Sequence, residues 1–233
     1  MSSSRAIELS WKPSLEAQEP EVERHSCGAQ TTMIKELSFD ETRMKNAVRE
    51  FLCAAGLDPT DPQLVDTPGR VLQAWRDEFL MGYGLNPKTV LAERFPDPST
   101  GPVVVSGLHF ISVCPHHLLP YQGVAHIAYV PKGEVVGLSR LSKLLDCLGR
   151  RLILQEALTQ AITESLMDAL GTSGAACLME AQHGCVSLRG ARQEHAQAVT
   201  VSYRGAFEQE ESLRLFFLRA IPPCHVIGHR AEH

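Results

Sequence analysis

Apolar residues recur at helical spacing in two stretches of the first third of the chain. Over residues 40–55 they fall on one helical face, and Gly56 follows them as a C-cap glycine would. A second amphipathic helix is predicted from Thr67 to near Gly82, because Thr67 can cap a helix and Pro68 suits its first position. The folded part of the chain is therefore expected to open with a pair of helices.

Two more helices are predicted in the second half of the sequence. The first spans residues 139–148, with Ser139 as its N-cap and a stripe of leucines as its buried face. The second spans residues 154–170, carries its own apolar stripe and ends at Gly171.

Extended apolar runs between and after these helices predict β-strands. The predicted strands span residues 103–113, 122–131, 175–182, 185–189 and 198–207, and a turn at residues 132–133 separates the second of them from residues 135–139. Residues 83–101, rich in proline and glycine, are expected to form a loop. Helices come first, then a strand pair, a helix pair and further strands, which is the order of an α+β domain with an antiparallel sheet.

Composition divides the chain into a folded region and two tails. Residues 1–34 are rich in Ser, Glu and Pro with little periodicity, and are expected to be a flexible N-terminal tail. Residues 35–221 form the predicted folded region, and 222–233 a short C-terminal tail. A chain of 233 residues with 44% hydrophobic residues can bury one good-sized core or two small ones.

Hydropathy, cysteine content and charge restrict the expected cellular location and the class of binding partner. There is no apolar run long enough for a transmembrane helix and no apolar segment after Met1 typical of a signal peptide, so a cytoplasmic protein is expected. The seven cysteines are scattered, unlike the dense disulfide framework of a small secreted domain. A formal net charge of −5 argues against general affinity for nucleic acid but leaves room for a local basic pocket.

Candidate metal chemistry lies in the segment Ser-Val-Cys-Pro-His-His-Leu-Leu-Pro at 112–120, where a predicted strand ends. The Cys-x-x-His spacing lets a thiolate and an imidazole reach one ion across a tight turn, and zinc prefers these donors. A second His/Cys pair, in Gln-His-Gly-Cys at 182–185, could complete the set of metal ligands. Three protein ligands and a free position are typical of catalytic zinc, whereas structural sites use four.

The local geometry of the first segment leaves two arrangements open. On a straight strand Cys114 and His116 would share a face. Pro115 cannot donate to a strand ladder, so the strand is expected to end there, and after a turn Cys114 and His117 can converge while His116 stays free as a proton carrier. The alternative function is purely structural, with two packed histidines and an inert buried cysteine.

A basic edge lies near the start of the third predicted helix. Arg140 and Lys143 are one turn apart and off its apolar stripe. The simpler interpretation is a solvated basic edge. Because this edge lies beside a helix N-terminus, it is also a candidate anion site.

Six motifs resemble the GTP cyclohydrolase I family in order and spacing. They are Asp-Thr-Pro-Gly-Arg at 66–70, Cys-Pro-His-His-Leu-Leu-Pro at 114–120, Gly-Leu-Ser at 137–139, Gln-Glu at 155–156, His-Gly-Cys at 183–185 and Leu-Arg-Gly at 188–190. The resemblance covers about residues 40–221. It implies an α+β tunnelling fold (T-fold), in which the subunits pool antiparallel sheets into a barrel with helices outside. It also implies a homodecamer of two pentamers, with active sites between subunits.

The reaction that this resemblance implies is the zinc-dependent hydrolysis of GTP at C8. That carbon leaves as formate, and rearrangement gives 7,8-dihydroneopterin triphosphate, in the first step of tetrahydrofolate and pterin biosynthesis. By resemblance, Cys114, His117 and Cys185 are expected to hold zinc. His116 and His183 match the acid/base positions, and imidazoles that titrate near pH 7 suit this role.

The substrate-binding residues are also assigned by resemblance. Glu156 matches the carboxylate that holds the guanine edge, and Gln155 is a second expected contact; an exposed helix residue is the simpler interpretation of Glu156. For the triphosphate the match supplies a set of mostly basic residues: Arg70, Ser139, Arg140, Lys143 and Arg189. Local cations of this kind explain how an acidic protein binds a tetra-anion.

Some positions depart from the family pattern. Pro115 stands where Glu is usual, Gln73 where Lys is common, and Gly184 where a larger residue is common; Arg140 and Lys143 exchange the usual Lys and Arg. These changes leave open a T-fold paralogue that acts on another purine nucleotide or stops at an earlier intermediate. A non-catalytic purine-binding member is the third alternative, but it would be expected to lack one of the two acid/base histidines.

Overall fold

The computed structural model describes residues 39–222, which all lie within the unit Ile34–His233. The tail predicted at 1–34 lies outside the described residues, and so does the C-terminal tail from residue 223 onward.

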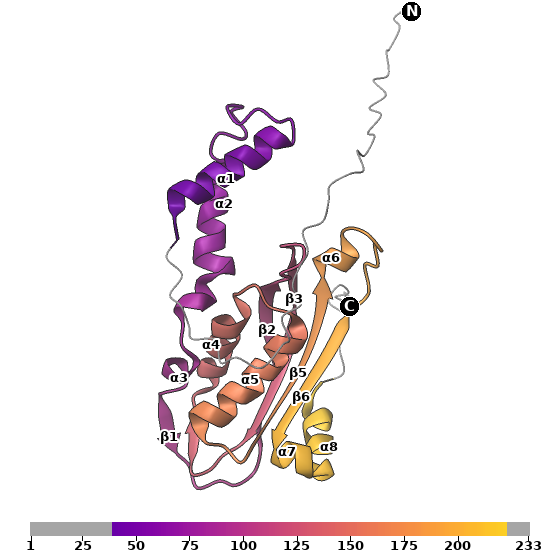
Figure 1. Ribbon diagram of the computed structural model, residues 1–233. Helices are drawn as coiled ribbons and strands as arrows, with labels where there is room; N and C mark the ends of the chain where they lie inside the picture. The colour runs from indigo at the N-terminus through magenta and orange to yellow at the C-terminus, as the bar shows by residue number, and fades with distance from the viewer. Residues whose placement is uncertain (1–38, 223–233) are drawn as a thin grey trace, which may run out of the picture. The chain divides into compact units, whose positions relative to one another are not determined.

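The main sheet has four antiparallel strands in the order β2-β3-β5-β6, so β2 and β6 are its edges (Figure 1). The strands are β2 (Val103–Val113), β3 (Pro120–Val130), β5 (Gly174–His183) and β6 (Ala198–Gly205). A smaller sheet pairs β1 (Arg94–Pro96) with β4 (Glu134–Val136). The main strands therefore lie within about two residues of the apolar runs that predicted them.

Two helices, α4 (Leu138–Gly149) and α5 (Gln155–Leu170), cover one face of the main sheet (Figure 1). Their apolar stripes are buried as predicted, and they meet strand residues spaced two apart, such as Ile127 and Tyr129. Full burial of one such aliphatic side chain contributes about 1.5–3 kcal/mol, so this layer forms the main core.

The opposite face of the sheet is covered at one end by α7 (Ala206–Gln209) and α8 (Glu211–Ala220). Ala128 and Ala176, partners across β3 and β5, are buried there with Phe207 and Phe217. The strand predicted over 198–207 is two residues too long, because Gly205 adopts a φ of +59° and the chain turns directly into α7. No prediction covered α8.

The predicted N-terminal helix pair is present as α1 (Glu41–Ala54) and α2 (Thr67–Ala74). Gly56 has a φ of +78° just after α1, in agreement with its predicted role as the C-cap glycine. The second helix continues as a π-helical turn, Trp75–Phe79, which carries it close to the predicted end. The predicted loop that follows contains the short helix α3 (Pro87–Val90) as well as β1.

The two predicted N-caps were each wrong by one or two positions. Thr67 is the first residue of α2, and Asp66 is its N-cap. Ser139 lies inside α4, whose N-cap is Gly137. Gly137 has an extended backbone, and the helix begins at Leu138, which is earlier than an N-cap at Ser139 would place it.

The strand predicted over 185–189 was also wrong, because this segment begins with a helical turn, α6 (Gly184–Ser187). The Ser187 hydroxyl donates to the His183 carbonyl at 3.1 Å, and the Leu188 amide donates to the Gly184 carbonyl at 3.0 Å. The apolar residues of this segment do not form a buried strand face, since Leu188 is largely exposed.

The α+β class with an antiparallel sheet is confirmed. Among the helices of residues 39–222, none has both the length and the hydropathy needed to cross a membrane.

Candidate active site

A tight turn between β2 and β3 carries the first candidate residues. The Cys114 amide donates to the Leu119 carbonyl at 2.9 Å, and the Leu118 amide donates to the Cys114 carbonyl at 2.9 Å. Leu118 adopts a φ of +53°, which lets the chain reverse within these residues. The strand ends at Val113, directly before Cys114 and Pro115, as the sequence predicted.

The second His/Cys pair reaches the same end of the sheet through strand pairing. Tyr121 of β3 is opposite His183 of β5, so the turn before β3 and helix α6 after β5 lie next to each other. Gly184 makes this approach close: a Cβ built there would lie 2.9 Å from the Pro120 carbonyl oxygen. Strand register and a residue without a side chain therefore bring Cys185 to the turn.

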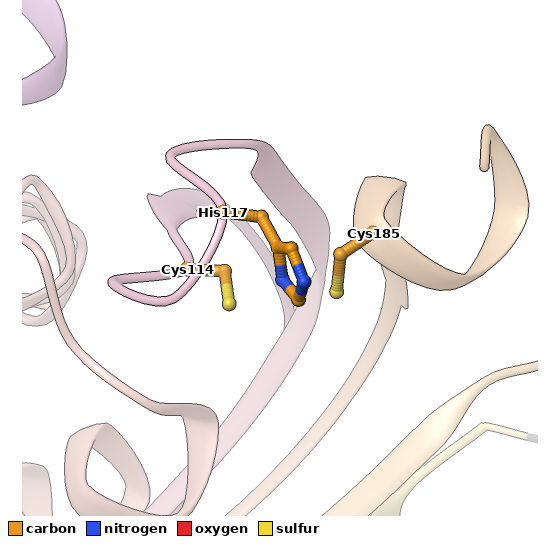
Figure 2. A group of neighbouring side chains, drawn as sticks. All are labelled: Cys114, His117 and Cys185. Carbon is orange, nitrogen blue, oxygen red and sulfur yellow. The ribbon is translucent and has the colours of Figure 1, made fainter. Parts of the chain in front are cut away.

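Cys114, His117 and Cys185 converge at this point (Figure 2). Their ligand atoms all lie within 4.8 Å of one another, and within residues 39–222 this is the group of His, Cys and acidic side chains that could hold a metal ion. In Figure 2 the His117 imidazole lies between the two thiols. The predicted convergence of Cys114 with His117 after a turn agrees with this geometry.

The electrostatics of the two thiols favour a bound cation. Burial raises the pKa of the Cys185 thiol, and the neighbouring Cys114 raises it further, while the Arg189 guanidinium lowers it. Two adjacent thiolates repel each other, and a divalent ion between them removes that repulsion and stabilises both. The donor set of two sulfurs and one imidazole nitrogen therefore fits a metal ion that prefers soft ligands.

His116 has a different environment from His117. It is exposed, and its Nδ1 lies 3.9 Å from Cys114 Sγ. The two imidazole rings are nearly perpendicular, at 82°, with centroids 6.4 Å apart. His116 is thus next to the cluster without belonging to it, and its ring is accessible.

His183 is held on two sides. Its ring stacks on Tyr121 with centroids 4.5 Å apart and an interplanar angle of 3°, and its Nε2 lies 2.7 Å from Gln155 Oε1. Burial lowers the pKa of His183, and the Glu156 carboxylate opposes that shift. Glu156 is exposed in the first turn of α5, so a carboxylate faces the site at this histidine.

Tyr121 is a site residue that the sequence interpretation missed. Its hydroxyl donates to the Ile153 carbonyl at 2.9 Å, its side chain is 1% exposed, and burial raises its pKa to about 12. A neutral, fixed phenol ring supports the imidazole of His183. The available signal was its position directly after Pro120, at the start of the strand that pairs with β5.

The residues expected to bind the triphosphate do not all lie at the cluster. Arg189 follows α6, and its guanidinium lowers the pKa of the Cys185 thiol. Arg70 is on α2 and pairs with Asp66 at 3.3 Å, whereas Arg140 is on α4 and pairs with Glu93. Ser139 and Lys143 are exposed on α4. Neither α2 nor α4 contributes a residue to the Cys114–His117–Cys185 cluster.

Comparison with known proteins gives the family. The sequence pattern of GTP cyclohydrolase I matches residues 44–222. The chain belongs to the GTP cyclohydrolase I family. A protein named GTP cyclohydrolase 1 from Streptomyces avermitilis is 42% identical over 169 residues, which is 72% of this chain and 84% of that protein. One of the same name from Clostridium perfringens is 37% identical over 183 residues, 78% of this chain and 98% of that protein.

Membership of the GTP cyclohydrolase I family confirms the resemblance stated from the motifs and identifies the chain as an enzyme of that family. The antiparallel sheet with α4 and α5 on one face is the T-fold that the resemblance implied. Two of the departures from the family pattern, Pro115 and Gly184, lie in the turn and at the start of α6, beside the proposed ligands. A third, Gln73, is exposed on α2.

Proposed function

We propose that this enzyme hydrolyses GTP at C8, releases formate and rearranges the product to 7,8-dihydroneopterin triphosphate. The observation that carries the proposal is the cluster of Cys114, His117 and Cys185, whose ligand atoms lie within 4.8 Å, with His116 and His183 beside it. Family membership supports GTP as the substrate.

Zinc is the proposed metal, held by Cys114, His117 and Cys185. Two thiolates and an imidazole are donors that zinc prefers, and three protein ligands leave a position open for chemistry. When bound, zinc acts as a Lewis acid that makes water a competent nucleophile near neutral pH. The chain itself supplies the groups that position GTP and move protons.

His116 and His183 are the proposed acid/base pair. The purine ring nitrogens must be protonated as their bonds to C8 break, and an imidazole can deliver a proton near neutral pH. His116 is accessible from solvent, which allows it to exchange protons with water. His183 is half-buried against Tyr121, which fixes the direction in which it presents its ring.

Glu156 is the proposed guanine anchor. A carboxylate accepts two parallel hydrogen bonds, from ring N1–H and the exocyclic amine of guanine, and adenine cannot supply them. The Glu156 carboxylate is exposed and near enough to His183 to affect its pKa, so a base held there would be adjacent to the proposed proton donor. A site built on these bonds rejects ATP strongly, because its polar groups would stay unpaired.

The triphosphate is proposed to contact Arg189 of the same chain together with Arg70, Ser139, Arg140 and Lys143. These last four lie on α2 and α4, elements that contribute nothing to the cluster, and neighbouring subunits of an oligomer can supply them. Within residues 39–222, β2 and β6 are the edges of the main sheet, and edge strands of neighbouring subunits in a ring could pair with them. A homodecamer is the assembly proposed on family grounds.

The test is an assay of formate and fluorescent pterin formed from GTP by the full chain before and after metal removal. We expect loss of both products on chelation, recovery with zinc, and parallel loss of metal and activity in Cys185→Ser. Cys53→Ser is the matched control, because Cys53 is exposed on α1. An active metal-free preparation would refute the zinc proposal. Formate without pterin would instead indicate a reaction that stops at an earlier intermediate.

A further inference from the structure

Gln155, expected to contact guanine, has its side-chain amide committed within the chain. The residue is 1% exposed. Its amide nitrogen lies 3.1 Å from the Met179 carbonyl, 3.0 Å from the Ala198 carbonyl and 3.1 Å from Thr200 Oγ1. Two of these partners are backbone carbonyl oxygens, which only accept hydrogen bonds. This end of the amide is therefore the NH₂ group, and Oε1 is the other end.

The neighbouring hydroxyls agree with this orientation. Thr159 Oγ1 donates its single proton to the Gln155 backbone carbonyl at 2.7 Å. Thr200 Oγ1, 2.6 Å from Thr159 Oγ1, must then donate to Thr159, and its lone pair is left to accept from the Gln155 amide. A flipped amide would place an oxygen against two carbonyl oxygens and break this chain of bonds.

The orientation of Gln155 determines which nitrogen of His183 carries hydrogen. Gln155 Oε1 lies 2.7 Å from His183 Nε2, and an amide oxygen can only accept. His183 Nε2 therefore donates, and in the neutral ring the lone pair is on Nδ1. Stacking on Tyr121 at 4.5 Å holds the ring plane while the hydrogen bond holds its rotation.

We propose that Gln155 is a positioning residue that holds His183 as the Nε2–H tautomer, so that His183 exchanges protons with the substrate at Nδ1. The inference rests on the proposed function of His183 as an acid/base. In this step Nδ1 of the neutral ring accepts a proton from water and gives it to a purine nitrogen as the bond from that nitrogen to C8 breaks, while the Nε2–H bond to Gln155 persists. The role replaces the guanine contact implied for Gln155, since both amide hydrogens are already used.

Nitrogen-15 NMR of the histidines in the zinc-loaded full chain tests the tautomer directly. At a pH where the ring is neutral, His183 Nε2 should resonate as a protonated nitrogen and Nδ1 as a bare one. Gln155→Met removes the acceptor with little change in volume, and we expect the His183 signals to shift toward a mixture of tautomers. A bare Nε2 in the unmodified protein would overturn the proposal whether or not the chain acts on GTP.

Kinetics with GTP distinguish positioning from direct contact. Gln155→Met should lower kcat by roughly 10–100-fold, below the 10²–10⁴-fold typical of losing an acid/base, and leave KM nearly unchanged. In a His183→Ala background the same substitution should cost almost nothing more, because Gln155 acts through His183. A rise in KM in both backgrounds would show that Gln155 contacts guanine instead. Absence of pterin formation by the unmodified chain would refute the proposed function, and the NMR result would still stand by itself.

Two controls separate this role from a general effect on folding. Gln160→Met changes an exposed glutamine of the same helix and should leave kcat and the His183 spectrum unchanged. Thr200→Val removes one support of the amide but keeps the Met179 and Ala198 carbonyls, so it should lower the melting temperature and preserve the tautomer. Equal spectral change in Thr200→Val and Gln155→Met would contradict a specific role for Oε1.

Discussion

Although the family pattern commonly has a larger residue at this position, Gly184→Ala should weaken metal binding in this chain without unfolding the protein. Gly184 lies between His183 and the proposed ligand Cys185, and an added Cβ would be 2.9 Å from the Pro120 carbonyl oxygen. Ordinary contact begins near 3.4 Å, so α6 or the turn before β3 must move by about 0.5 Å. Both segments carry proposed ligands, and the methyl group pushes them apart.

The size of the effect follows from the geometry of the cluster. The ligand atoms lie within 4.8 Å of one another. Four-coordinate zinc with sulfur and nitrogen ligands holds such atoms about 3.6–3.8 Å apart, so the two segments must keep this close spacing for the metal to bind. Overpacking of this kind costs roughly 1–3 kcal/mol, and displacement of the proposed ligands from this spacing should reduce zinc affinity by about 10–100-fold.

Competition with a chromogenic zinc chelator measures this affinity, and thermal unfolding of the metal-free protein measures folding. Gly101→Ala is the matched control, because a Cβ at Gly101 meets no atom within 4 Å. The control should bind zinc as the unmodified chain does. If folded Gly184→Ala bound zinc with unchanged affinity, the contact between α6 and the turn would not control the spacing of the proposed ligands.

Three further predictions test other parts of the structure. His117→Ala should lower zinc content, whereas His116→Ala should keep zinc and lose about 10²–10⁴-fold in turnover; metal analysis with the reverse result would exclude the proposed ligand set. Glu156→Gln should weaken GTP binding with zinc retained, and equilibrium binding that matches the unmodified chain would argue against a guanine anchor. Burial lowers the pKa of His126 below its ordinary 6.5, with Glu180 opposing, and its Nδ1 accepts from the Gly107 amide. The folded chain therefore favours the neutral ring, so stability should fall as the pH decreases below about 6.5. His126→Gln should flatten this dependence in urea unfolding, and an unchanged dependence would assign it to other groups.

Much of the fold follows from the sequence because its layers are amphipathic. The leucine stripes of α4 and α5 identify buried helix faces, and the apolar runs identify β2, β3 and β5 within about two residues. The convergence of Cys114 and His117 was also predictable, since Pro115 cannot continue a ladder and a turn must follow. These inferences use local chemistry only.

What could not be predicted depends on contacts between segments distant in sequence. Gln155 at the start of an amphipathic helix has no local feature that indicates burial, and its partners Met179 and Ala198 belong to two different strands. The segment 185–189 was predicted as a strand, but Val186 and Leu188 are exposed and the segment begins with a helical turn. Pairing across the sheet decides these environments.

The register of β3 with β5 is the feature on which the whole site depends. It places Tyr121 opposite His183 and, two residues further, Gly123 opposite Ala181. A Cβ at Gly123 would lie 1.8 Å from the Glu180 carbonyl oxygen, so the two backbones approach there in a way that only glycine permits. A slip by one residue would turn every side chain of β3 to the other face, removing Tyr121 from His183 and separating Cys114 and His117 from Cys185. The residues of the proposed metal cluster and the stacked histidine are thus brought together by one strand pairing, with a close contact that disfavours other registers.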